Sequence, residues 1–110
     1  MAEAPKRLGS LSGSTAATTL VDNTATAGTY TIFSAIVFCN TDTVDRTFTM
    51  STSNTAATHG TYITSAAIIR PNDTVTFDKV ILDASSGARY LVVTVSAAAV
   101  HVSAFGVQGP

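Results

Sequence analysis

The sequence predicts an all-β fold: a single antiparallel β-sandwich, jelly-roll or immunoglobulin-like, with about seven strands and an extended N-terminal arm. Three observations lead to this prediction. β-Branched residues dominate the chain, and no apolar stripe recurs at the helical period of about 3.6 residues. Apolar segments alternate with clusters of Gly, Pro, Asn, Asp and Ser, as in sandwiches and barrels. The length of 110 residues suits one domain.

The first part of the chain differs in composition from the rest. Residues 1–16 are rich in Gly, Ser and Ala and show no periodicity, so we expect an arm outside the core, followed by a sandwich domain over residues 17–110. A disordered tail is the alternative. Within the arm, one basic pair and two larger apolar side chains are suited to contact a partner protein. These candidate partner-binding residues are Lys6, Arg7, Leu8 and Leu11.

The first half of the domain contains three expected strands, Thr18–Asp22, Thr29–Asn40 and Arg46–Ser53. The second is the most apolar, and a period of two divides its apolar side chains between two faces. One face holds Ile32, Ile36 and Phe38, and the other holds Phe33, Ala35, Val37 and Cys39. A strand that is apolar on both faces lies centrally or has one face covered by a partner chain.

Four further strands are expected in the second half of the domain. They are Tyr62–Arg70, Thr74–Leu82, Tyr90–Ser96 and Ala98–Val107. Pro71-Asn72-Asp73 separates the first two as a turn, because Pro fixes φ and the Asn and Asp side chains bond to their own backbone. In the last strand, Val100, Val102 and Ala104 fall on one side, opposite His101, Ser103, Phe105 and Val107.

Composition argues against several classes of ligand. A net charge of −1 and a charged fraction of 12% provide no basic patch for nucleic acid. The first ten residues lack the apolar region of a signal peptide, and no apolar run reaches the ~18 residues needed to cross a bilayer. We therefore expect a soluble protein, made in a cytoplasm, with no nucleic-acid or membrane partner.

Few residues in the chain are suited to chemistry. His59 and His101 show no arrangement typical of a catalytic triad, and phosphate-binding glycine motifs are absent. Asp42 and Asp45 lie in one expected loop, where turn formation explains them better than a cation site. The lone Cys39 is typical of a small buried hydrophobe. We therefore predict no catalytic, cofactor or metal site and no small-molecule substrate.

The low fraction of charged residues indicates that the folded chain associates with other copies of itself. Monomeric sheets usually guard their edges with charges or Pro, and the strands of this chain have few of either. We therefore expect a closed homo-oligomer, most simply a homotrimer. Its contacts should use one face of Thr29–Asn40 or of Ala98–Val107.

Several short motifs, taken together, resemble a family of short β-rich virion proteins of tailed bacteriophages. They are Lys6-Arg7-Leu8-Gly9, the apolar strand ending in Cys39-Asn40, Thr47-Phe48-Thr49, Pro71-Asn72-Asp73-Thr74 and Ala104-Phe105-Gly106-Val107. The resemblance covers most of the chain. It implies a virion structural protein, most simply a capsid decoration (cement) protein that bridges and stabilises major capsid subunits.

In that role, the arm residues named above would contact the capsid, and the loops Thr41–Asp45 and Ser53–Gly60 would face solvent or neighbours. A neck, tail or baseplate adaptor that binds another virion protein is the alternative. A host-surface or carbohydrate-binding module is a further one, disfavoured because Trp is absent and the three Tyr are scattered.

Overall fold

The computed structural model describes residues 6–12, 15–23, 30–78, 80–83 and 89–109. These residues form strands and connecting turns, and no helix is present among them. The strands are β1 (Lys6–Ser12), β2 (Thr18–Asp22), β3 (Tyr30–Asn40), β4 (Arg46–Ser53), β5 (Thr61–Ile69), β6 (Thr74–Phe77), β7 (Ile81–Asp83), β8 (Tyr90–Val95) and β9 (Val100–Gly109).

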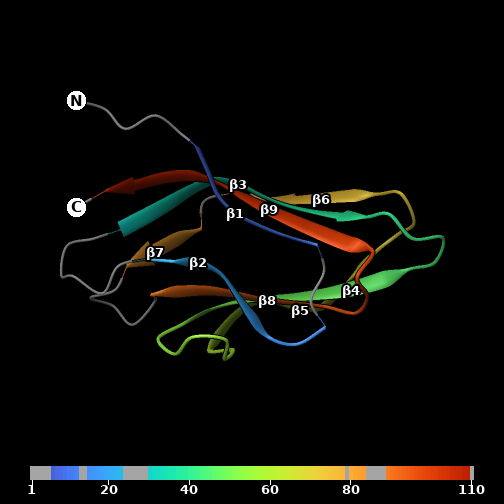
Figure 1. Cartoon of the computed structure of the whole chain (residues 1–110), viewed down its shortest axis with the longest axis horizontal. Coiled ribbons are helices and arrows are strands. Elements are labelled where there is room, and N and C mark those ends of the chain that lie inside the picture. The colour runs from blue at the N-terminus through green and yellow to red at the C-terminus, as the bar shows by residue number, and fades with distance from the viewer. Residues whose placement is uncertain (1–5, 13–14, 24–29, 79, 84–88, 110) are drawn as a thin grey trace.

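The strands form two antiparallel sheets, which confirms the predicted all-β class. Sheet A has the order β1-β9-β3-β6, and β7 also pairs with β3. Sheet B has the order β2-β8-β4-β5. Figure 1 shows the sheets as two layers, and the chain passes from one layer to the other at most of its connections. Strands distant in sequence therefore lie side by side in both sheets.

Residues 6–12 of the expected N-terminal arm belong to the sandwich instead. Residues 6–12 form β1, which pairs with β9 from Lys6↔Gly106 to Ser12↔His101. Two apolar side chains in this short segment are enough to add it to the sandwich, because Leu8 and Leu11 pack against the core cluster. Residues 1–5 and 13–14 of the predicted arm lie outside the described residues.

A β-bulge in β3 changes which side chains face the core. The pairing of β3 with β9 shifts register between Phe33 and Ala35, opposite Gly106. The predicted faces of this strand are therefore wrong in its first half: Phe33 is buried and Ile32 is 45% exposed. A Cβ at position 106 would collide with the Ile32 carbonyl oxygen, so this close approach requires glycine.

The predicted strand Thr74–Leu82 is divided into two. β6 pairs with the second half of β3 and β7 with its first half, and Val80 lies between them. The turn before β6 forms as expected. Asp73 N donates to Arg70 O at 3.1 Å, and Asn72 has a φ of 58°. Asn tolerates this left-handed conformation better than most residues, and Pro71 presets the preceding φ.

The core lies between the sheets and is centred on three aromatic rings. Phe38 of sheet A stacks on Phe48 of sheet B with ring centroids 4.2 Å apart. Phe77 meets both rings edge-on, at 6.1 and 5.7 Å. In β9, the three side chains predicted to share one face are all buried: Val100, Val102 and Ala104.

Candidate functional site

The outer face of sheet A carries an exposed apolar surface over its central strands. The register places Ile81, Ile32 and Val107 side by side on β7, β3 and β9. The next row pairs Ala35 with Phe105. Ile81 is 55% exposed, Ile32 45% and Phe105 37%. We call these five residues the sheet A patch.

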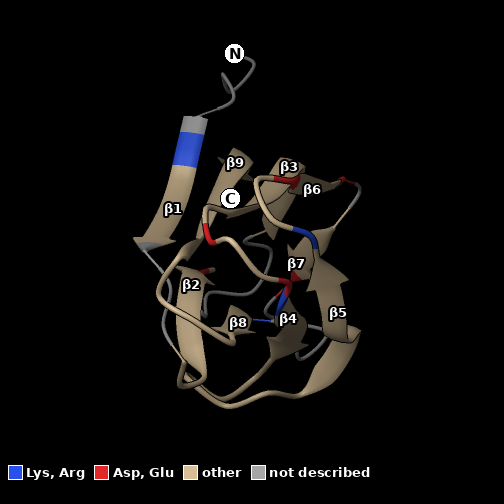
Figure 2. Ribbon diagram, turned by 90° about the vertical axis from the view of Figure 1, so that its right-hand side faces the viewer, with Lys and Arg blue, Asp and Glu red and all other residues tan. Residues whose placement is uncertain are grey.

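The two central strands under this patch, β3 and β9, carry no Lys, Arg, Asp or Glu, whereas β7, which carries Ile81, ends at Asp83. The coloured residues in Figure 2 lie mainly at strand ends and in connections. The outer face of a solvent-exposed sheet is normally polar. An uncharged patch on central strands is instead typical of a surface that another protein covers.

The four predicted partner-binding residues have different environments in the structure. The side chains of Leu8 and Leu11 are partly buried against the chain's own core, so their main apolar contacts are internal. Arg7 is exposed on β1 and pairs with Phe105 of the sheet A patch. Lys6 is placed by its backbone pairing with Gly106. Among these four residues, only Arg7 is described with an exposed side chain beside a surface available to a partner.

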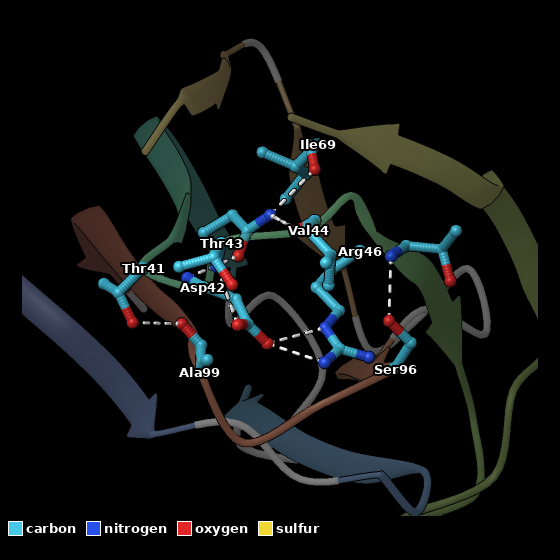
Figure 3. A network of polar contacts seen from close by, with 10 residues as sticks. Thr41, Asp42, Thr43, Val44, Arg46, Ile69, Ser96 and Ala99 are labelled. Atoms are coloured by element: carbon cyan, nitrogen blue, oxygen red, sulfur yellow. Dashed lines mark hydrogen bonds and ion pairs between the residues drawn. The ribbon is translucent and has the colours of Figure 1, made fainter. Parts of the chain in front are cut away.

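A polar network joins three connections at one end of the sandwich (Figure 3). At its centre Asn40 is fully buried, and its Nδ2 donates to Val44 O at 3.0 Å and Ile69 O at 2.9 Å. Asn40 Oδ1 accepts from Asp42 N at 2.9 Å. Nearby, the Thr41 hydroxyl donates to the carbonyl of Ala99 at 2.7 Å. The network therefore holds the chain where it leaves β3, β5 and β8.

Asp42 completes the outer side of this network. Arg46 donates to Asp42 Oδ2 from Nε at 2.9 Å and from Nη2 at 2.6 Å. The backbone N–H of Thr43 bonds to Asp42 Oδ1 at 2.7 Å. The Thr43 N–H and then the Arg46 guanidinium lower the pKa of Asp42 below its ordinary value of 3.8. The Asp42 carboxylate is therefore engaged in an internal ion pair with Arg46.

This pKa shift predicts an acid-dependent contribution to stability. Because the folded state lowers the pKa of Asp42, the contribution is present above pH 3.8 and is lost as pH falls through the folded pKa. Asp42→Asn should therefore be less stable than wild type at neutral pH, and the difference should disappear in acid. Urea unfolding of both proteins at a series of pH values from 7 to 2 measures this difference in the free energy of unfolding.

The matched control for this experiment is Asp45→Asn, which changes an exposed carboxylate in the same loop. Its effect should be smaller than that of Asp42→Asn. A constant difference between Asp42→Asn and wild type across the whole pH range would contradict the proposed role of the carboxylate charge.

His59 anchors the loop between β4 and β5 to the outer face of sheet B. Its Nδ1 lies 2.7 Å from Ser51 Oγ, and its Nε2 lies 2.7 Å from Thr94 Oγ1. The His59 ring also stacks on Tyr62, with centroids 5.4 Å apart. Ser51 is fully buried, so this serine–histidine contact anchors the loop and offers no exposed nucleophile. The sequence alone does not predict the contacts of His59 with both side chains, because Ser51 and Thr94 lie on strands far apart in the chain.

A second ion pair joins β2 to the start of β8. Arg89 Nε donates to Asp22 Oδ1 at 2.9 Å, and the Arg89 guanidinium lies 4.8 Å from the Tyr90 ring centroid. The hydrogen bond to the Asp22 carboxylate raises the pKa of Arg89. This ion pair therefore links two neighbouring segments of sheet B.

Three further observations concern the described residues alone. No pocket is found on their surface, and no three metal-binding side chains gather on it. No helix among them is long and apolar enough to span a bilayer.

Comparisons with protein-family models, curated proteins and solved structures found no match to this chain. The sheet A patch is therefore the feature on which a functional proposal rests.

Proposed function

We propose that this chain is a structural protein of a bacteriophage virion, and most specifically a capsid decoration (cement) protein that acts by association. The observation that carries the proposal is the sheet A patch, in which Ile32, Ile81 and Phe105 are exposed and the two central strands, β3 and β9, carry no charged residue. Such a face is stabilised when a protein surface covers it. The patch supports association with another protein, and the resemblance of the sequence motifs to small phage virion proteins supports the virion as the place of that association.

The strand order supports assigning the sandwich to the jelly-roll type. Sheet A has the order β1-β9-β3-β6 and sheet B the order β2-β8-β4-β5. If β6 and β7 count as one interrupted strand, the domain has eight strands in two sheets of four, as in the two Greek keys of a jelly roll. Jelly rolls are common in viral capsid domains, which agrees with the proposal.

In this proposal the protein acts mechanically. Folded subunits associate with one another and with the major capsid protein, and many modest contacts add through multivalency to resist internal pressure. A homotrimer is the assembly expected from the sequence alone. The number of subunits in the assembly depends on which surface of a neighbouring copy covers the sheet A patch.

The copy number of the chain in purified particles of the encoding phage tests this function. Quantitative mass spectrometry against the major capsid protein should find hundreds of copies, near stoichiometric with the capsid subunit. Removing the gene should then yield particles that release DNA at lower temperature, and adding the purified protein back should restore their resistance.

A low copy number would contradict the decoration role in a specific way. About three to twelve copies would indicate a neck, tail or baseplate adaptor, because such rings have few subunits. Absence from the particle would reject the virion role.

A further inference from the structure

We propose that the sheet A patch is covered by the same patch of a second copy, related by a twofold axis parallel to the strands. The axis lies between β9 and β3, the two central strands of sheet A. This inference rests on the self-association in the proposed function and specifies its geometry. The assembly is then a dimer with an isologous interface, in place of the trimer expected from the sequence.

The argument starts from one cross-strand row. Arg7 on β1 pairs with Phe105 on β9, and Phe105 pairs with Ala35 on β3. On the other side of β3, Phe77 pairs with Ile36, so Asp78 follows β6 at the level of Ala35. The row therefore runs from a positive side chain at one edge, across two apolar residues, to a negative side chain at the other edge.

A twofold axis between β9 and β3 reverses this row in the second copy. Arg7 of each copy then faces Asp78 of the other, which makes the interface complementary in charge. Phe105 lies over the small Ala35, so a large side chain meets a small one. In the next row Val107 lies over Ile32, which places two β-branched side chains in contact. Shape and charge therefore match in the same register.

Both charged residues are available for this contact. Arg7 and Asp78 are exposed, and neither forms an ion pair with another described residue. Between them the row contains no charge, so pairing the two faces buries no unpaired ion in its centre. Sheets pack face to face about 10 Å apart, a distance at which these side chains meet.

The other exposed apolar group lies on sheet B and provides a control. Tyr62, Ile63 and Ile68 are exposed on β5, the edge strand. Register shifts interrupt the pairing of β5 with β4, and Ala66 has a φ of 50°. Such irregularities guard an edge strand against pairing with another chain. A substitution at Ile68 therefore changes an exposed apolar side chain outside the proposed interface.

Sedimentation velocity over a dilution series of the purified chain is the first test. Wild type should show a species of twice the 11.3 kDa mass of one chain. Phe105→Lys should weaken this dimer by at least about thirtyfold, because it places charge at the centre of the interface. Ile68→Lys, the matched control, should leave dimerisation unchanged. Circular dichroism should show that both variants remain folded.

Charge reversal tests the orientation of the two copies. Arg7→Asp and Asp78→Arg should each weaken the dimer by about tenfold, because like charges then face each other. The double variant should restore wild-type dimerisation. A monomer at all concentrations, a species of three times the chain mass, or reversal without rescue in the double variant would overturn the proposal.

These results separate the inference from the proposed function. A high copy number in particles together with a monomeric or trimeric chain would leave the virion role intact and reject the twofold interface. A dimer with charge-reversal rescue that is missing from particles would support the interface and reject the virion role.

Discussion

Phe38→Ala should lower the free energy of unfolding by about 3–5 kcal/mol. Phe38 is fully buried and stacks on Phe48 across the two sheets, with Phe77 at the edge of both rings. Removing the ring leaves a cavity at the contact between the layers, because neighbours held in two sheets relax only partly. Domains of this size have total stabilities of about 5–15 kcal/mol, so much of the stability would be lost.

Urea unfolding followed by far-ultraviolet circular dichroism measures this loss. Phe105→Ala is the matched control, since it removes the same side chain from the outer face of the same sheet, where it is 37% exposed. In dilute solution its effect should be about 1 kcal/mol or less. Similar losses for the two variants would mean that the aromatic cluster is not the centre of the core.

Asn40→Ala is expected to lower the free energy of unfolding by about 2–4 kcal/mol. The side chain amide of Asn40 donates to the carbonyls of Val44 and Ile69 and accepts from Asp42 N, in a fully buried position. Alanine would leave two carbonyl oxygens and one N–H without this partner. Burying a polar group without a hydrogen-bond partner lowers the free energy of unfolding substantially.

Two variants show whether the amide donors are responsible. Asn40→Asp keeps an acceptor for Asp42 N but faces the two carbonyls with oxygen, so it should destabilise at least as much as alanine at neutral pH. Thr41→Ala removes a single exposed hydrogen bond from the same loop and should have an effect below about 1 kcal/mol. If Asn40→Ala unfolds at the wild-type midpoint, water replaces the amide and the network has no structural role.

The sequence predicted strands wherever apolar alternation was sustained. The predicted bounds of Thr18–Asp22 and Arg46–Ser53 are those of β2 and β4. β1 was missed because Gly and Ser mask its two leucines, and pairing with β9 at the other end of the chain leaves no local signal. The faces of Ile32 and Phe33 were assigned wrongly because strict alternation does not allow for a bulge.

The candidate site was only partly accessible from the sequence. The pattern of Ala98–Val107 places Phe105 and Val107 on one face. The position of Ile81 beside them depends on β7, which was not separated from β6 in the prediction. The role of Asn40 also escaped prediction. Its partners Val44 and Ile69 contribute backbone carbonyls, which side-chain patterns do not reveal.

The pairing of β1 with β9 also determines when this protein is able to fold. The first and last strands of the chain are neighbours in one sheet, and β3 lies directly beyond β9. During synthesis, β1 and β3 lack their shared partner until β9 has been made. Pairing over such long sequence separations is slow, typically milliseconds to seconds for all-β domains. Sheet A is therefore completed only after β9 becomes available, even though β1 and β3 precede it by many residues.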